Sequence, residues 1–168
     1  MTTTFDRDEM IQKIADRLLE EKKSIVTVES CTGGGIAFSL TDFPGSSNWF
    51  DRAYVTYSNE AKQQMVGVNE QTIIDFGAVS ESVAGEMAMG GLKQSQVDFS
   101  LSVTGVAGPG GGSPAKPVGM VCFGWAVRDE RGNEIFTTET RYFKGDRQSV
   151  RSQTIFYSLS FFLENFLC

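Results

Sequence analysis

The chain has 168 residues, of which 40% are hydrophobic and 21% charged, as in an ordinary globular protein with a buried core. Its formal net charge of −6 argues against binding along the phosphate backbone of a nucleic acid, so we expect no nucleic-acid partner. No apolar run reaches the ~18 residues of a membrane span, and the N-terminus lacks the pattern of a signal peptide. We therefore expect a cytoplasmic protein that does not bind a membrane.

The numbers of cysteines and histidines limit which catalytic mechanisms and metal sites the chain can form. Three cysteines, Cys31, Cys122 and Cys168, are too few for a disulfide framework, which fits a reducing compartment. The chain has no histidine at all, so Ser-His-Asp and Cys-His catalysis are excluded and the commonest zinc ligand is missing. The acidic residues show no metal-ligand spacing. We expect no metal and no organic cofactor, and a hydrolase built from this chain needs a base other than histidine.

The first half of the chain alternates predicted helices and strands. Asp6 and Glu9 have the spacing of a capping box, and apolar residues at helical spacing continue that helix to residue 23. Asn59 is a candidate helix cap. The patterns predict a strand over 24–28, a helix over 33–40, a loop over 44–47, a strand over 53–57 and a helix over 59–65.

The second half predicts further strands around a long loop. Ser80 marks the start of a helix over 79–94, and Asp146 caps the last helix. Between them we expect a strand over 99–104, a glycine-rich loop over 105–119, and a hairpin of strands over 118–127 and 134–143. This order predicts an α/β fold, a three-layer α/β/α sandwich with a mixed, mostly parallel sheet, in a single domain over 1–168.

The last predicted helix carries an apolar stripe that ends in aromatic residues. Phe161, Phe162 and Phe166 lie on it at helical spacing. They indicate either packing in the core or a surface that pairs two copies of the chain, and the sequence leaves both readings open.

Ser30 lies between a predicted strand and a predicted helix, in the segment ESCTGGG over residues 29–35. Ligands of open α/β sheets bind at the carboxyl ends of strands, where Ser30 would lie. Backbone N–H groups of Thr32, Gly33 and Gly34 at the start of the following helix are candidate donors to a developing oxyanion. A plain capped β–α turn explains the same residues, and both readings stay open.

The segment YSNEAK, residues 57–62, follows the next predicted strand and should open at the same edge. It places Tyr57, Asn59 and Lys62 at a strand–helix junction. Lys62 is the best candidate base in a chain without histidine, provided that burial or a neighbouring cation lowers its pKa. A solvated lysine is the plainer interpretation.

Two further segments are candidates for binding substrate. The glycine-rich loop begins after Thr104, and its first residues, Gly105, Ala107 and Gly108, can bring backbone N–H groups close to a phosphate or sugar. Arg147 lies in the first turn of the last helix, where a cation opposes the helix dipole unless an anion is bound there. A flexible surface loop and a surface ion pair are the alternative readings.

Five segments in this order resemble the CinA C-terminal domain family: ESCTGG (29–34), SSNWFDRAYVTYSNEAK (46–62), GAVSE (77–81), TGVAGPGGGSPAKPVG (104–119) and GDR (145–147). The resemblance implies a three-layer α/β/α fold and a homodimer. It also implies hydrolytic deamidation of nicotinamide mononucleotide, a C–N hydrolase reaction on a linear amide that gives nicotinate mononucleotide and ammonia. Larger family members carry an N-terminal nucleotide-pyrophosphatase domain, whose activity and metal we do not transfer.

The same resemblance assigns roles to the candidate residues. Ser30 would be the nucleophile and Lys62 the base, in a Ser/Lys mechanism. Tyr57 would assist proton transfer or orient the pair, and Arg147 would serve the substrate phosphate. The turn over residues 32–34 would lie at the oxyanion.

Two rival interpretations remain at this stage. Cys31 is intrinsically the better nucleophile, although it points one residue further round the turn than Ser30. Alternatively, the chain is a non-catalytic nucleotide-binding module with a regulatory or scaffold role, as the family's association with competence and DNA damage suggests. These interpretations differ in whether the protein turns over a substrate and in which side chain turnover requires.

Overall fold

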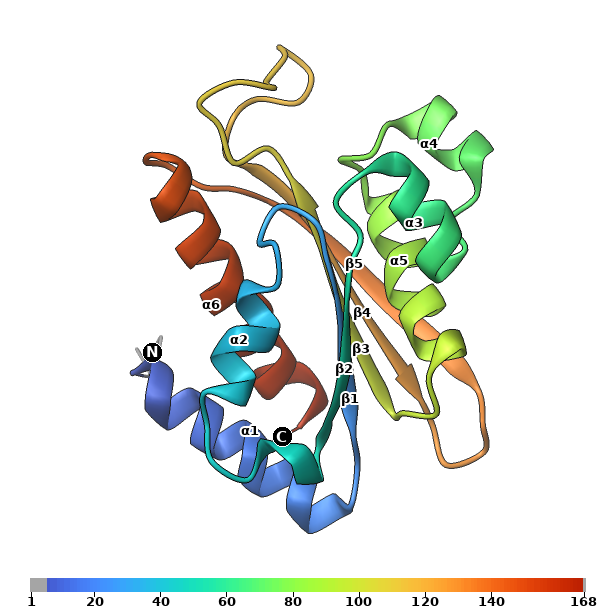
Figure 1. The fold of residues 1–168 in the computed structure, drawn as a ribbon, viewed down its shortest axis with the longest axis vertical. Coiled ribbons are helices and arrows are strands. Elements are labelled where there is room, and N and C mark those ends of the chain that lie inside the picture. Colours follow the sequence, from blue (N-terminus) through green and yellow to red (C-terminus); the bar gives the residue numbers. More distant parts are fainter. Residues whose placement is uncertain (1–5, 168) are drawn as a thin grey trace.

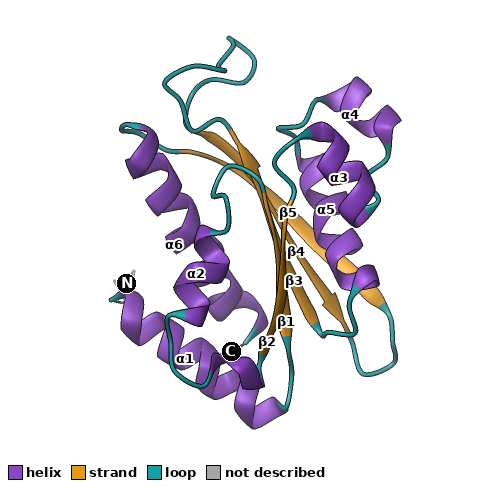
Figure 2. Ribbon diagram, in the orientation of Figure 1, coloured by secondary structure: helices purple, strands orange, loops and turns teal. Residues whose placement is uncertain are grey.

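A computed structural model describes residues 6–167, and the chain folds around one five-stranded sheet with helices on both faces (Figure 1, Figure 2). The helices are α1 (Arg7–Glu21), α2 (Gly35–Thr41), α3 (Asn59–Val66), α4 (Glu70–Phe76), α5 (Glu81–Gln94) and α6 (Arg147–Phe166), with a 3-10 turn, η1 (Ser46–Asn48). The strands are β1 (Ile25–Glu29), β2 (Phe50–Val55), β3 (Phe99–Gly105), β4 (Met120–Arg128) and β5 (Glu134–Tyr142).

The sheet is mixed, with strand order β2-β1-β3-β4-β5. β1 pairs in parallel with both β2 and β3, whereas β4 runs antiparallel to its two neighbours, β3 and β5. Helices α1, α2 and α6 cover one face, and α3, α4 and α5 cover the other (Figure 1). The predicted three-layer α/β/α fold with a mixed sheet is therefore confirmed, and β1, β2 and β3 end at the same edge of the sheet.

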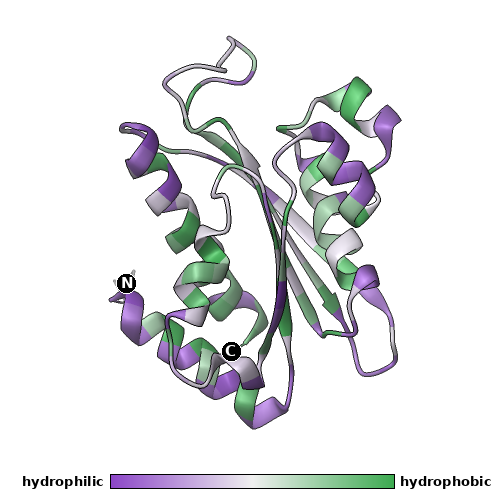
Figure 3. Ribbon diagram, in the orientation of Figure 1, coloured by the Kyte–Doolittle hydropathy of each residue, from purple (hydrophilic) through white to green (hydrophobic). Residues whose placement is uncertain are grey.

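The central strands are buried on both faces because helices cover them on both sides. All five residues of β1 are buried, as are all but the last of β3, where the apolar Phe99, Leu101 and Val103 alternate with the small polar Ser100, Ser102 and Thr104. Hydrophobic colouring gathers on the helix sides that face the sheet (Figure 3). The covered sheet thus provides a rigid support for the loops at its carboxyl edge.

The aromatic residues of α6 pack within the chain. Phe161 stacks on Trp125 at 4.0 Å between ring centroids, and Phe162 meets Phe99 edge to face at 5.1 Å. Phe166 also contacts Phe99, at 6.5 Å. These contacts place Phe162 in the core, whereas Phe161 and Phe166 pack against the core and stay partly exposed, so the pairing of two copies on this surface stays a prediction.

Several local predictions change in detail. The sequence analysis missed α4, although Asn69, whose side chain accepts a hydrogen bond from the N–H of Gln71, begins it and a glycine ends it. Ser58 rather than Asn59 caps α3, and Asp6 precedes α1 without a side-chain capping bond.

The other predicted helix caps agree with the structure, whereas one strand is shifted. The expected caps Ser80 and Asp146 are confirmed. β2 lies earlier than predicted, at Phe50–Val55, which leaves residues 56–58 as a connection to α3. Among the described helices, none is long and apolar enough to cross a membrane.

Candidate active site

The carboxyl edge of β1, β2 and β3 opens into a cavity of about 290 Å³. Its walls come from the turn after β1, the β2–α3 connection with the start of α3, the α4–α5 turn, the loop after β3, and the start of α6. The lining residues are Ser30, Cys31, Tyr57, Asn59, Lys62, Ala78, Val79, Thr104, Gly105, Val106, Ala107, Gly108, Gly110, Gly111 and Arg147. Segments far apart in the sequence therefore meet here, as the shared strand edge predicts.

Ser30 is held by the backbone immediately after β1. Its N–H donates to the carbonyl of Val103 at 3.1 Å, which extends the pairing with β3 by one residue. Its carbonyl accepts the N–H of Gly33 at 3.0 Å, and Gly33 and Gly34 both take positive φ values, 59° and 97°. Glycine adopts this left-handed turn without steric cost, so the chain reverses sharply and leaves the Ser30 side chain at the cavity.

Glu29 fixes the same turn from the side of the core. Its carboxylate is fully buried and accepts four hydrogen bonds: from the hydroxyls of Thr27 (3.1 Å) and Thr32 (2.6 Å) and from the N–H groups of Ile36 (2.8 Å) and Ala37 (3.0 Å). A negative charge at the start of α2 is favoured by the helix dipole. The sequence analysis assigned Glu29 no role of its own. The signal it missed is an acidic residue placed directly before a strand-to-helix turn.

Arg151 of α6 holds the turn from the opposite side. Its guanidinium donates to the carbonyls of Cys31 and Thr32, both at 3.1 Å. The peptide groups that follow Ser30 are thus oriented by a side chain that lies about 120 residues further along the chain. This role was not visible in the sequence, where Arg151 shares a helix face with Arg147.

Lys62 lies within hydrogen-bonding distance of the candidate nucleophile. Its Nζ is 3.1 Å from Ser30 Oγ, 2.9 Å from the carbonyl oxygen of Thr56 and 3.3 Å from that of Tyr57. The side chain is 1% exposed, and within residues 6–167 no carboxylate is among its hydrogen-bond partners. Burial lowers the pKa of Lys62, because the ammonium form loses hydration that these neutral partners do not replace.

The three contacts of Lys62 can be made in either protonation state of its amine. The ammonium form donates to all three oxygens, and the Ser30 hydroxyl then donates to the Tyr57 carbonyl at 3.5 Å. The neutral form donates to the two carbonyl oxygens, which can only accept, and its lone pair can accept from the hydroxyl of Ser30. In this protonation state the Ser30 proton already points to the amine that would remove it, which is the geometry of a nucleophile and its general base.

Cys31 has the opposite character. Its side chain is buried in the apolar core beside α2 and is only 5% exposed. Burial raises the pKa of the thiol to about 12, so it stays protonated near neutral pH. The thiolate is the nucleophilic form of cysteine, and this environment disfavours it.

Tyr57 and Arg147 form the outer wall of the cavity. The Arg147 guanidinium donates to the carbonyl of Gly108 at 2.7 Å and to the Tyr57 hydroxyl at 3.3 Å. The Tyr57 side chain is 61% exposed, and it is the main-chain carbonyl of Tyr57, not the hydroxyl, that contacts Lys62. The tyrosine therefore orients the base through its backbone, while its ring and hydroxyl lie with Arg147 toward solvent.

The remaining predicted site residues divide into two groups. Asn59, Thr104, Gly105, Ala107 and Gly108 line the cavity, and the Thr104 hydroxyl donates to the carbonyl of Ala78 at 2.8 Å. Thr32, Gly33 and Gly34 do not line it. Thr32 is buried with its hydroxyl on Glu29, and the N–H of Gly33 is engaged by Ser30. The N–H groups of Thr32 and Gly34 have no acceptor among residues 6–167, so their role as oxyanion donors stays a prediction.

The N–H of Cys31 is a further candidate oxyanion donor. Among residues 6–167 it has no hydrogen-bond acceptor on another residue, and Cys31 lines the cavity next to Ser30. The N–H of the residue after a nucleophile is a common oxyanion donor on strand-to-helix turns.

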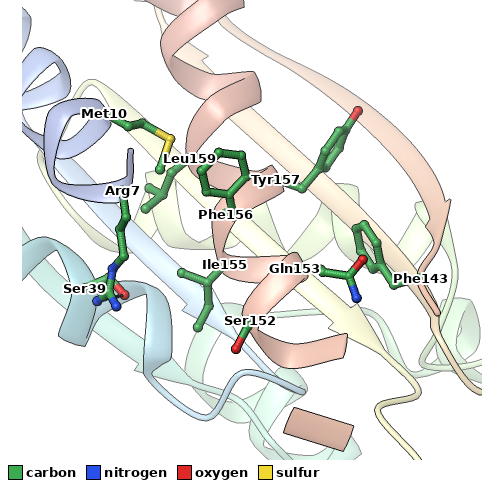
Figure 4. Close-up of a pocket in the computed structure, with 10 residues that line it drawn as sticks. All are labelled: Arg7, Met10, Ser39, Phe143, Ser152, Gln153, Ile155, Phe156, Tyr157 and Leu159. Atoms are coloured by element: carbon green, nitrogen blue, oxygen red, sulfur yellow. Dashed lines mark hydrogen bonds between the residues drawn. The ribbon is translucent and has the colours of Figure 1, made fainter. Parts of the chain in front are cut away.

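A larger cavity, of about 490 Å³, lies between α1, α2 and α6 (Figure 4). Its walls are mainly apolar, and of its serines Ser39 is already bonded to Arg7 and to the carbonyl of Gly35. No lysine lines it, so no serine there meets a base of the kind found beside Ser30. Within the described part of the chain, no three histidine, cysteine or acidic side chains are grouped as a metal site.

The family model for the CinA C-terminal domain matches residues 7–166. The chain belongs to the CinA C-terminal domain family. Two curated relatives in this family are named nicotinamide-nucleotide amidohydrolase PncC. The protein from Escherichia coli K12 is 46% identical over 159 residues, which is 95% of this chain and 94% of the relative. That from Enterobacter agglomerans is 50% identical over 143 residues, 85% of each chain.

A solved CinA-family structure shows the same fold. The competence/damage inducible protein CihA from Agrobacterium tumefaciens superposes with a TM-score of 0.87 at 39% identity, covering 98% of both chains. The similarity extends over the whole sheet and both helical layers, so the site residues above stand on a backbone that the family shares.

Proposed function

We propose that this protein is a nicotinamide-nucleotide amidohydrolase that deamidates nicotinamide mononucleotide to nicotinate mononucleotide and ammonia. The observation that carries the proposal is the contact of 3.1 Å between Ser30 Oγ and a buried lysine amine with no acidic partner. The names of the PncC relatives support the substrate, since this chain matches them over most of both lengths. The reaction would return a pyridine nucleotide to salvage in the cytoplasm.

The first half of the proposed reaction forms an acyl-enzyme. Neutral Lys62 takes the proton of Ser30, and Oγ attacks the carboxamide carbon. The N–H of Cys31 donates to the tetrahedral oxyanion. The ammonium of Lys62 then returns the proton to the amide nitrogen, the C–N bond breaks, and ammonia leaves.

The second half releases the product. Lys62, neutral again, removes a proton from a water molecule that attacks the acyl carbon. The second tetrahedral intermediate collapses, the proton passes from Lys62 back to Ser30 Oγ, and the product leaves as the carboxylic acid, which loses its remaining proton to solvent. Every proton transfer within the site uses the one amine, so the mechanism needs no metal or organic cofactor.

The outer wall suits the rest of the nucleotide. Arg147 offers a guanidinium beside the first turn of α6, where free N–H groups and a cation together favour a phosphate. Thr104, Gly105, Ala107, Gly108 and Asn59 would contact the ribose or the pyridine ring. Thr32, Gly33 and Gly34 would lie at the oxyanion, where the N–H groups of Thr32 and Gly34, which have no acceptor among residues 6–167, are further donors.

Replacing the nucleophile tests this proposal. Ser30→Ala should reduce ammonia release from nicotinamide mononucleotide by at least about a thousandfold, because no other hydroxyl is placed beside the amine. Cys31→Ala is the matched control at the next residue, and it should keep activity within about tenfold. Both variants should unfold at the wild-type temperature to within a few degrees. Retained turnover in Ser30→Ala, or its loss only in Cys31→Ala, would contradict the assignment of the nucleophile.

A second proposal is that the chain acts only as a nucleotide-binding CinA-like regulatory or scaffold module. It rests on Arg147 and the glycine-rich loop, which line the cavity and would bind a nucleotide equally well without turnover. We also propose that the protein is a homodimer, as the family resemblance implies. Light scattering would test this against the 18.4 kDa mass of one chain.

A further inference from the structure

The loop between β3 and β4 supplies a whole wall of the cavity but has little structure of its own. Gly105, Val106, Ala107, Gly108, Gly110 and Gly111 line the cavity from this loop. Residues 109–118 are exposed except Lys116, and the loop extends beyond the sheet edge between the two helical layers (Figure 1). A segment so rich in glycine has high conformational entropy when it is free. Its position therefore depends on a small number of contacts.

The loop is held at its base and on the side of α6. The N–H of Val106 donates to the carbonyl of Met120 at 2.9 Å, and the N–H of Gly119 donates back to Val106 at 2.8 Å. Arg147 binds the carbonyl of Gly108 from the start of α6. In the returning half, residues 113–118, the base adds one backbone bond, from the N–H of Met120 to the Pro117 carbonyl at 3.0 Å.

Lys116 holds the loop on the side of α4 and α5. Its side chain is half-buried although its loop neighbours are exposed, and its ammonium donates to the carbonyls of Phe76 and Val79, the latter at 2.5 Å. A turn fixes its backbone: the Ser113 N–H donates to the Lys116 carbonyl at 2.9 Å, and the Lys116 N–H donates to the Ser113 hydroxyl at 3.1 Å. The lysine thus joins the loop to the α4–α5 turn, 37 and 40 residues earlier in the chain.

The α4–α5 turn is shaped to receive this ammonium. Phe76 is the last residue of α4, so its carbonyl lies at the negative end of the helix dipole, where a cation is favoured. Gly77 follows with φ of 79°, and a Cβ there would lie 2.8 Å from Lys116 Nζ. A residue with a side chain at position 77 would collide with the ammonium.

The joined turn is itself part of the active site. Ala78 and Val79 line the cavity opposite the loop, and the Thr104 hydroxyl binds the Ala78 carbonyl. Lys116 therefore connects two walls of one cavity without lining it. Its ammonium is engaged by main-chain carbonyls rather than offered to a ligand.

We propose that Lys116 is a positioning residue that holds the glycine-rich loop against the α4–α5 turn and so forms the substrate pocket before substrate arrives. A loop that is already ordered does not have to be ordered on binding, so the contact strengthens substrate affinity. Lys62 and Ser30 touch neither Lys116 nor its partners, so the chemical step does not depend on it. The kinetic part of this inference rests on the proposed function, whereas the structural part does not.

The test compares Lys116→Met with the control Lys93→Met, which removes the same charge from an exposed position on α5. Amide hydrogen exchange of the free full-length protein is the first measurement. Residues 105–119 should exchange at least about tenfold faster in Lys116→Met than in wild type, and Lys93→Met should match wild type.

Steady-state ammonia release is the second measurement. KM for nicotinamide mononucleotide should rise about tenfold in Lys116→Met with kcat within twofold, since a hydrogen bond to a charged group is typically equivalent to a factor of this size or more. Lys116→Arg, whose guanidinium can reach the same carbonyls, should restore most of both properties.

Each possible result supports or overturns a stated part of the proposal. Unchanged exchange over residues 105–119 in Lys116→Met overturns the proposal regardless of kinetics. Faster exchange with an unchanged KM overturns the claim that the contact serves substrate binding, as does a fall in kcat at constant KM. If wild type releases no ammonia from nicotinamide mononucleotide, the proposed function fails separately. The exchange data then decide alone whether Lys116 orders the loop.

Discussion

Ser30 and Lys62 are 32 residues apart in the sequence, and only the fold brings Oγ and Nζ to 3.1 Å. The sequence identified both as candidates, because each follows a predicted strand and the chain has no histidine to serve as a base. It did not predict that Lys62 would be 1% exposed and bound to two carbonyls. Burial depends on long-range packing, and burial is what lowers the pKa of this lysine.

The buried lysine predicts how stability depends on pH. The pKa of Lys62 is lowered in the folded protein from its ordinary value of 10.5, so between the lowered value and 10.5 the unfolded chain binds more protons. The free energy of unfolding should therefore rise with pH in this window, by up to about 1.4 kcal/mol per pH unit, and level off above it. Lys62→Met lacks this contribution. The stability of wild type relative to Lys62→Met should increase from pH 7 to pH 10.

Urea unfolding of both proteins at several pH values measures this difference, in which the contributions of the other titrating groups cancel. Lys93→Met is the control, since its lysine is exposed and its curve should run parallel to that of wild type. If the Lys62→Met curve also runs parallel to wild type, Lys62 is not perturbed in solution and its role as a base at neutral pH loses its physical support.

At the scale of elements, the critical junction is the passage from β1 to α2. The sequence predicted this junction, but it attributed the start of the helix to Ser30 and the glycines. The structure assigns the cap to Glu29, whose carboxylate reaches forward seven and eight residues to the N–H groups of Ile36 and Ala37. A cap contributed from the end of a strand has no fixed spacing, so pattern rules for helix starts do not detect it. Helix α4 is a different case. Its cap, Asn69, is an ordinary one that the pattern rules could have detected, and the sequence analysis overlooked it.

This junction predicts that Glu29→Gln is strongly destabilising. Each carboxylate oxygen accepts one hydroxyl and one backbone N–H, so an amide nitrogen in either position would face two donors with hydrogens of its own. We expect a loss of about 3 kcal/mol in the free energy of unfolding, since bonds to buried charged groups are each worth about 1.5–3 kcal/mol. Urea unfolding at pH 7 measures it. Glu20→Gln, an exposed position on α1, should change stability by less than about 0.5 kcal/mol. A loss below about 1 kcal/mol in Glu29→Gln would show that the charge is not required for the junction.

At the scale of the whole molecule, the site depends on both helical layers. Lys62 and the α4–α5 turn come from one face of the sheet, Arg147 and Arg151 come from the other, and the glycine-rich loop lies between them. The order of elements and the shared strand edge were predictable from the sequence, because hydrophobic periodicity and the parallel-sheet rule determine them. The contacts across the layers, such as Arg151 on the turn after Ser30, were not, because they join residues that no local pattern relates.

A ligand bound between the two layers should stabilise the entire fold rather than one loop. Ser30→Ala is the protein for this experiment, because it should bind nicotinamide mononucleotide without consuming it. At a ligand concentration about a hundred times Kd, linkage gives about 2.7 kcal/mol, or a rise of about 5–10 °C in Tm for a chain of this size. Nicotinamide at the same concentration lacks the ribose and phosphate and should give a much smaller rise. The comparison therefore isolates the part of binding that we attribute to Arg147 and the loop.

Together with turnover, the same measurement separates the two proposed functions. An enzyme gives thermal stabilisation in Ser30→Ala and ammonia in wild type, whereas a binding module gives stabilisation in both and ammonia in neither. No stabilisation at saturating nucleotide, in a protein that unfolds cooperatively, would exclude both proposals for this ligand. The physical reason is linkage: a ligand that contacts β1, α3 and α6 together cannot bind without favouring the state in which these elements are assembled.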